Sequence, residues 1–141
     1  VRGTIVSAVH AGWRGVVAGV VTRAVQRMAD DAAISPGDLV AAVGPCIGVN
    51  AFEVGSEVAQ AFEQAGLGDA IDSTRLTAAD GRPHIDLRSA VRKQLTDAGV
   101  SPDAIDVSDA CTFGKVDDLF SYRREGRRAG RQGAVIGVKA G

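Results

Sequence analysis

The hydrophobic period changes from that of a strand to that of a helix and back within residues 4–43, and this change constrains the fold most. A β-branched run over Thr4-Ile5-Val6-Ser7-Ala8-Val9 is typical of a short strand. The apolar residues after the next turn recur at helical spacing: Val17, Val20, Val21, Ala24, Val25 and Met28. Ser35-Pro36-Gly37-Asp38 stops this helix, and Leu39 to Val43 is apolar again. The pattern predicts a strand–helix–strand unit of an α/β fold.

The later part of the chain continues this alternation. Apolar residues share one helical face over residues 54–65, and the glycine that follows is suited to a helix C-terminus. Asp86 is placed to cap a third helix that ends at Gly99. Two further strands are predicted over residues 105–108 and 133–138.

Length and composition narrow the class of protein. A chain of 141 residues is expected to form one domain over residues 1–141, because a single core serves this length. Sixteen Lys and Arg against seventeen Asp and Glu give a net charge of -1, which argues against nucleic acid or an anionic membrane as partner. Two cysteines form no disulfide framework, and no apolar run reaches the roughly 20 residues that span a bilayer. We therefore expect a cytoplasmic protein.

The turn His10-Ala11-Gly12-Trp13-Arg14-Gly15 is the first candidate for a binding site. It lies between a predicted strand and a predicted helix, where α/β proteins gather ligands. Free amides at the helix start favour an anion, and the Arg14 guanidinium can bind phosphate through two hydrogen bonds. The alternative is a hydrogen-bonded core His10, with Arg14 as a solvated surface charge.

Cys46 follows the second predicted strand, within Gly44-Pro45-Cys46-Ile47-Gly48. Parallel strands end at the same edge of a sheet, so Cys46 is expected near His10, and a catalytic Cys–His pair is conceivable. Free cysteine is also among the most commonly buried residue types, which favours a structural role for Cys46 and still more for Cys111.

Arginine is concentrated between Phe120 and Arg131, in a segment that also holds the single tyrosine, Tyr122. Guanidinium groups such as that of Arg123 match phosphate oxygens, and a tyrosine ring can stack on a base. A solvated loop is the alternative. His84 precedes a predicted helix start and is interpreted as structural. The histidines and cysteines do not have the spacing of a zinc site.

Seven segments of the chain occur in an order known from one protein family: Val9 to Gly15, Gly44 to Gly48, Phe52 to Gly55, Asp86-Leu87, Cys111-Thr112, Phe120 to Arg124 and Gly130-Arg131. With these segments the chain resembles the YfiH family, also called the laccase-domain or polyphenol oxidase family. Members are regarded as zinc-dependent purine nucleoside phosphorylases. The resemblance covers essentially the whole chain, which matches only the C-terminal part of family members.

The resemblance implies a mixed-sheet α/β/β/α sandwich related to the deamidase domain of cytotoxic necrotizing toxins, here incomplete at its N-terminus. It also implies a zinc ion held by two histidines and one cysteine, of which this chain carries only His10. The other ligands are expected from an N-terminal segment that this sequence lacks. Cys46 and Cys111 do not match the ligand cysteine. The older name of the family implies copper as the cofactor. Two histidines are too few for a multicopper site.

The activity implied by the resemblance is cleavage of adenosine, inosine or guanosine by phosphate, which yields a purine base and ribose 1-phosphate. Adenosine deamination and methylthioadenosine phosphorolysis are implied as side activities. Arg14 and Arg123 are the candidates for contact with phosphate or substrate. Three alternatives remain: a metal-independent hydrolase that uses Cys46 with His10, a multicopper phenol oxidoreductase, and nucleic-acid binding by the arginine-rich segment.

Overall fold

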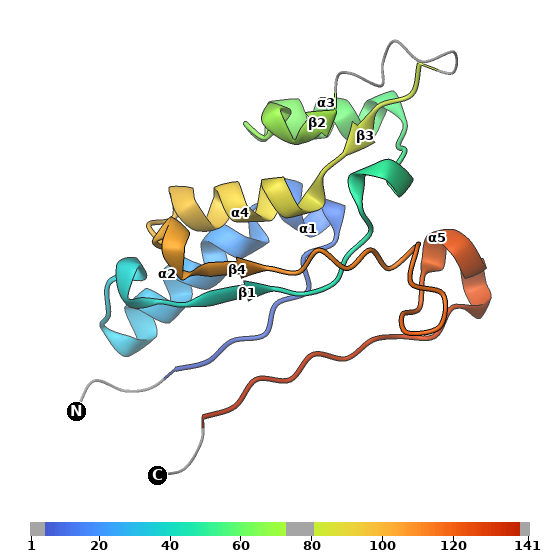
Figure 1. Ribbon diagram of the computed structural model, residues 1–141. Coiled ribbons are helices and arrows are strands. Elements are labelled where there is room, and N and C mark those ends of the chain that lie inside the picture. The colour runs from blue at the N-terminus through green and yellow to red at the C-terminus, as the bar shows by residue number, and fades with distance from the viewer. Residues whose placement is uncertain (1–4, 73–80, 139–141) are drawn as a thin grey trace.

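The computed structural model describes residues 5–72 and 81–138 (Figure 1). Its helices are α1 (Trp13–Val17), α2 (Val20–Ala32), α3 (Ser56–Gln64), α4 (Leu87–Asp97) and α5 (Tyr122–Glu125). Its strands are β1 (Ala41–Val43), β2 (Ile71–Asp72), β3 (His84–Ile85) and β4 (Ile105–Val107). No helix in this part of the chain is long and apolar enough to cross a membrane.

The strands form one parallel and one antiparallel pair. β1 pairs with β4 in parallel, with Ala41 opposite Ile105 and Val43 opposite Val107. β2 pairs with β3 in antiparallel orientation. α4 lies over β1 and β4, and α1 and α2 pack against α4 (Figure 1). The fold is therefore mixed α/β, as the sequence predicts.

The first predicted helix is two helices, α1 and α2. Its pattern runs unbroken from Val17 to Met28, but the backbone turns at Gly19, whose φ of 74° is left-handed. Gly19 donates its amide hydrogen to the carbonyl of Val16, which closes α1. Glycine adopts this conformation without the steric cost of a Cβ, so Gly19 allows α2 to start in a new direction.

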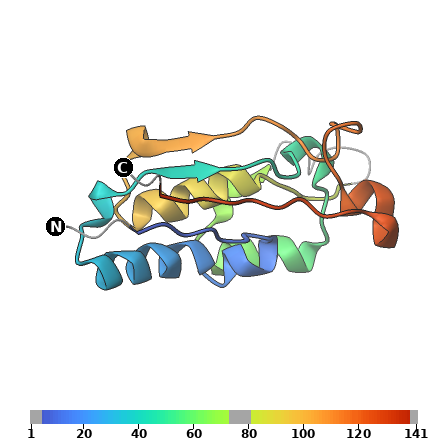
Figure 2. The same cartoon turned by 90° about the horizontal axis from the view of Figure 1, so that it is seen from below.

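The predicted strands over residues 4–9 and 133–138 are not strands in the described part of the molecule. Thr4 itself lies outside the described residues. Residues 5–9 and 132–138 are extended, but neither segment makes a backbone hydrogen bond to another described residue. Figure 2 shows both segments running roughly along the direction of β1. β-Branched runs favour extended backbone, but a strand also needs a hydrogen-bonded partner.

One hydrophobic core joins helices α1–α4 and strands β1–β4. Phe62 of α3 and Ile85 of β3 are fully buried at its centre, together with Val16 of α1. The predicted Asp86 cap is confirmed, because its carboxylate accepts hydrogen bonds from the amides of Arg88 and Ser89. This cap fixes the start of α4 directly after β3, and α4 then supplies the apolar surface that covers β1 and β4.

Candidate functional site

The turn that contains His10 leads directly into α1. Trp13 is the first residue of the helix, and Gly12 precedes it in an extended conformation without a side-chain cap. A Cβ atom on Gly12 would lie 3.1 Å from Nε2 of His10, so the imidazole folds back over the glycine. The His10 side chain is exposed, which differs from the core histidine considered as the alternative.

Arg14 lies on the same turn and is also exposed. Its guanidinium carbon stacks 4.4 Å from the centroid of the Trp13 ring. It makes no hydrogen bond or ion pair with another described residue, so its N–H groups remain available to a ligand. A guanidinium held against an aromatic ring loses side-chain freedom but keeps its donors, which suits recognition of an oxyanion.

Arg123 already contacts backbone oxygens of a neighbouring loop. Its Nη1 donates to the carbonyl of Glu53 at 2.8 Å and more weakly to that of Ala51 at 3.5 Å. Its guanidinium carbon also lies 5.5 Å from the centroid of the Phe52 ring. Arg123 therefore ties α5 to the loop before α3. Its contact with phosphate or substrate stays a prediction.

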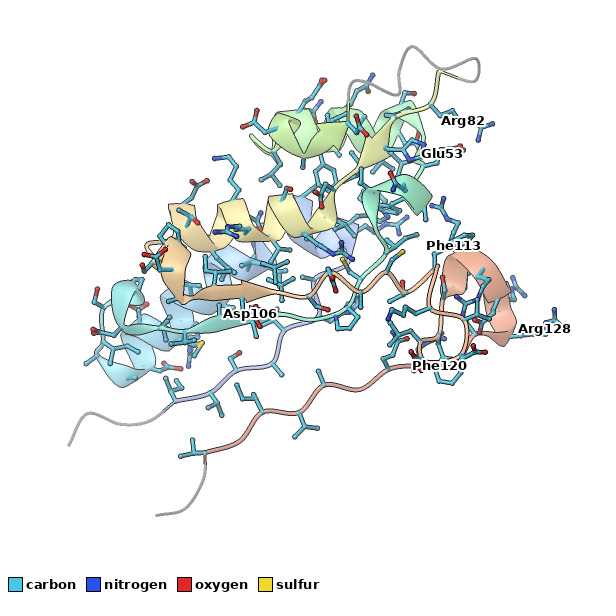
Figure 3. All side chains as sticks on the ribbon, viewed as in Figure 1. Glu53, Arg82, Asp106, Phe113, Phe120 and Arg128 are labelled. Atoms are coloured by element: carbon cyan, nitrogen blue, oxygen red, sulfur yellow. The ribbon has the colours of Figure 1, made fainter. Side chains whose placement is uncertain are left out.

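The loop that Arg123 contacts is fixed from the other side as well. Nδ1 of His84 donates to the carbonyl of Val49 at 2.7 Å, which supports the structural interpretation of His84. Arg82 forms an ion pair with Glu53 at 2.8 Å, and Figure 3 shows the two side chains together. These contacts hold residues 49–53 in place beside β3.

Arg124 organises the segment after Cys111, a role that its place in an arginine-rich run does not reveal. Its Nη1 donates to the carbonyls of Thr112 and Phe113, at 2.8 and 2.7 Å. Its Nη2 donates to the carbonyl of Leu119 and to Glu125. One half-buried guanidinium thus binds both ends of residues 112–119.

Changing Arg124 to Ala is expected to lower the free energy of unfolding by about 2 kcal/mol, because hydrogen bonds to a charged group contribute about 1.5–3 kcal/mol. Urea denaturation measures this loss, and trypsin should cut faster after the exposed Lys115. Arg128→Ala is the matched control, because the exposed side chain of Arg128 forms no hydrogen bond or ion pair with a described residue. Equal stability and equal proteolysis of the two variants would contradict the assigned role of Arg124.

The two cysteines lie opposite each other where the paired strands continue. Cys46 and Cys111 form an isolated parallel bridge beyond β1 and β4. Thr112 donates its amide hydrogen to the carbonyl of Cys46 at 3.0 Å. The Cys46 thiol donates to the carbonyl of Ile47 at 3.4 Å, and no hydrogen bond joins it to His10 among the described residues. Burial raises the pKa of the Cys46 thiol, which argues against Cys46 as the first nucleophile of a Cys–His hydrolase.

The pKa of Cys111 is shifted in the opposite direction, which the sequence does not reveal. The amide of Gly48 donates to its sulfur at 3.2 Å. Burial raises the pKa of Cys111, but hydrogen bonds from the amides of Gly48, Gly114 and Phe113 outweigh this effect. With the charge of Arg88 they hold the pKa of Cys111 below its usual value. Cys111, rather than Cys46, is the thiol prepared to ionise.

The pH dependence of alkylation should separate the two thiols. A lowered pKa keeps Cys111 as thiolate down to a lower pH than an ordinary cysteine, whereas the raised pKa of Cys46 keeps that thiol protonated to a higher pH. As pH rises, iodoacetamide should therefore label Cys111 before Cys46. Peptide mapping of the alkylated chain at a series of pH values measures the order. Labelling of Cys46 first would contradict this assignment.

The described residues do not form a metal site by themselves. Within residues 5–72 and 81–138, no group of three His, Cys, Asp or Glu residues is arranged to hold a metal ion. A catalytic zinc site takes three protein ligands. The described residues therefore do not supply a complete set of zinc ligands, and the assignment of His10 as a ligand stays a prediction.

Comparison with known proteins places these features in a family. Residues 1–139 match a family described as multi-copper polyphenol oxidoreductase laccase. A purine nucleoside phosphorylase from Bacteroides thetaiotaomicron is 40% identical over 129 residues, which cover 89% of this chain and 46% of that protein. An adenosine deaminase named RL5, from an unknown prokaryotic organism, is 40% identical over 90% of this chain and 48% of its own length.

A solved structure agrees with these sequence matches. The crystal structure of YlmD from Geobacillus stearothermophilus superposes with a TM-score of 0.73 and 31% identity, over 82% of this chain and 42% of that chain. The chain spans about half the length of the curated relatives that it matches.

Proposed function

The chain belongs to the multi-copper polyphenol oxidoreductase laccase family, and from that membership we propose that it is part of a purine nucleoside phosphorylase. The observation that carries the proposal is the 40% identity to a purine nucleoside phosphorylase over 89% of this chain. The substrates would be adenosine, inosine or guanosine together with phosphate, and the products a purine base and ribose 1-phosphate. The RL5 deaminase supports adenosine deamination as a second activity of the same site.

The exposed side chains of the first turn suit this reaction. Breaking the N-glycosidic bond builds positive charge on the ribose and negative charge on the base, so an enzyme gains rate by holding phosphate in line with the breaking bond. No described residue forms a hydrogen bond or ion pair with the Arg14 guanidinium, which lies on the same turn as His10, and Arg14 is our candidate for the phosphate contact. Arg123 is the second candidate, through the guanidinium nitrogens that do not bind Glu53.

We further propose that His10 supplies one zinc ligand, with the remaining ligands outside this chain. An exposed imidazole at the start of α1 can reach a ligand set brought by another segment. The proposed partners are small molecules only, and a net charge of -1 supports the absence of nucleic acid among them. The proposed compartment is the cytoplasm, where two free cysteines stay reduced.

The test is an assay of adenosine phosphorolysis with a version of the chain that also carries the family's earlier segment. We expect ribose 1-phosphate to form only with phosphate present, and activity to fall in a chelator. The 141-residue chain alone should show little activity, because its described residues offer no complete zinc site. Activity that persists in a chelator and needs Cys46 would instead support the Cys–His hydrolase.

Arg14→Lys tests the phosphate contact within the same assay. Lysine keeps the positive charge but loses the planar fork that binds two phosphate oxygens and stacks on Trp13. We expect phosphorolysis to fall about tenfold, the effect of losing roughly 1.4 kcal/mol of transition-state binding, with zinc content unchanged. A phosphate titration that gives the same kinetics for both proteins would return Arg14 to the role of a surface charge.

A further inference from the structure

We propose that Cys111 and Cys46 form a thiol pair that reacts with small-molecule disulfides, in which Cys111 attacks the disulfide and Cys46 resolves the product. Neither the family nor the proposed phosphorylase activity assigns this chemistry. The proposal rests on the register of the backbone, on the groups around each sulfur and on the unequal burial of the two thiols.

The register brings the two residues together. Cys46 and Cys111 are direct partners in a parallel bridge, held by the hydrogen bond from Thr112 to Cys46. Neighbouring strands lie about 4.8 Å apart, and a disulfide joins Cα atoms about 4.4–6.8 Å apart. Residues directly opposite in a ladder also project to the same face of the sheet. The usual spacing of a ladder therefore lies within the Cα–Cα range of a disulfide, which would form by rotation of the two side chains.

The surroundings of Cys111 suit the attacking thiol. Amides of Gly48, Phe113 and Gly114 point at its sulfur, which forms a cradle of backbone donors for a thiolate. The cradle is tight, because a Cβ atom on Gly48 would lie 3.3 Å from the sulfur. Cys111 is only partly buried, and the residues that follow it, Phe113 and Gly114, are exposed. A small disulfide can therefore approach this sulfur from solvent.

The surroundings of Cys46 suit the resolving thiol. Its thiol donates to the carbonyl of the next residue, Ile47. Arg88 also lies beside Cys46, but burial outweighs its effect and keeps the pKa of Cys46 raised. The Cys46 sulfur is the more deeply buried of the two, so an external disulfide reaches it less readily. Once Cys111 carries an adduct, the mixed disulfide lies opposite Cys46 in the ladder. Rotation about the Cα–Cβ bond of Cys46 would then bring its sulfur to the sulfur of Cys111.

The chemistry balances as two thiol–disulfide exchanges. The Cys111 thiolate attacks one sulfur of the small disulfide, which forms a mixed disulfide and expels one small thiolate. Cys46 loses its proton to solvent and attacks the sulfur of Cys111, which expels the second thiolate. One small disulfide is thus reduced to two thiols, while two protein thiols are oxidised to one disulfide. Reduction by a dithiol reverses both steps.

Glutathione disulfide is the probe, and intact-mass spectrometry of the chain over time is the readout. The wild type should pass through a single adduct to a product that lacks two hydrogens, with a Cys46–Cys111 cross-linked peptide after digestion. Cys46→Ser should stop at a stable adduct on Cys111. Cys111→Ser should form its adduct several-fold more slowly. Dithiothreitol should restore the starting mass in every case.

Three outcomes would overturn the proposal: a wild type that stops at the mixed disulfide, an adduct that forms first on Cys46, or a disulfide that joins two chains on a non-reducing gel. Far-UV circular dichroism checks that both serine variants fold. The cross-linked peptide needs only the wild type, so the proposal remains testable if a variant fails to fold. None of these readouts depends on phosphorylase activity, so the two proposals fail independently.

Discussion

Replacing His10 with Ala is expected to remove both bound zinc and purine nucleoside phosphorolysis from a protein that carries this chain together with the family's earlier segment. Losing an outer partner of a metal ligand costs about 10–100-fold in affinity or activity, and losing a ligand itself should cost more. The His10 ring is exposed and folded over Gly12, so its removal leaves no hole in the core. The loss should therefore be chemical rather than structural.

His84→Ala is the matched control for His10→Ala. It removes the other imidazole of the chain, whose Nδ1 binds the carbonyl of Val49. This variant should lose stability but keep its zinc. Elemental analysis measures the zinc bound by each variant, and the phosphorolysis assay measures its turnover. Stoichiometric zinc and normal turnover in the His10 variant would show that His10 is not a ligand.

Phe62→Ala should lower the free energy of unfolding by about 3–5 kcal/mol, the usual cost of truncating a buried phenylalanine. Phe62 is 0% exposed and lies where α3 joins the common core. Phe113→Ala is the control, because Phe113 is 39% exposed and lies near α5 (Figure 3). Urea denaturation of both variants measures the difference. A Phe62 variant as stable as the Phe113 variant would contradict the assigned core.

Features encoded by neighbouring residues could be predicted from the sequence. The Asp86 cap, the glycine that ends α3 and the apolar stripe of α4 all depend on residues a few positions apart. The break at Gly19 could also be predicted from the sequence, because a glycine inside a helical pattern weakens the helix at that position. The periodicity of the surrounding valines outweighed that signal and wrongly predicted one continuous helix.

Features that depend on distant residues could not be predicted. Cys111 receives one of its hydrogen bonds from Gly48, which lies 63 positions earlier, so the sequence around Cys111 does not show the full set of donors to its sulfur. Arg124 resembles its exposed neighbours in sequence, yet its donors are taken up by carbonyls of residues 112–119. The family resemblance does identify His10 and Arg14, but whether they bind zinc and phosphate stays a prediction.

The extended segments 5–9 and 132–138 form no backbone hydrogen bond with another described residue, so we expect them to favour association between copies of this chain. Val135 is 98% exposed and Val138 is 54% exposed, and residues 134–138 carry no charge or proline. Short uncharged segments of high β-propensity with free backbone donors and acceptors recruit identical segments from other molecules. The tendency of the chain to aggregate should therefore depend on residues 134–138 rather than on the stability of its core. Val135→Lys is expected to raise the solubility of the chain, because Val135 is 98% exposed and a charge there opposes pairing between identical segments.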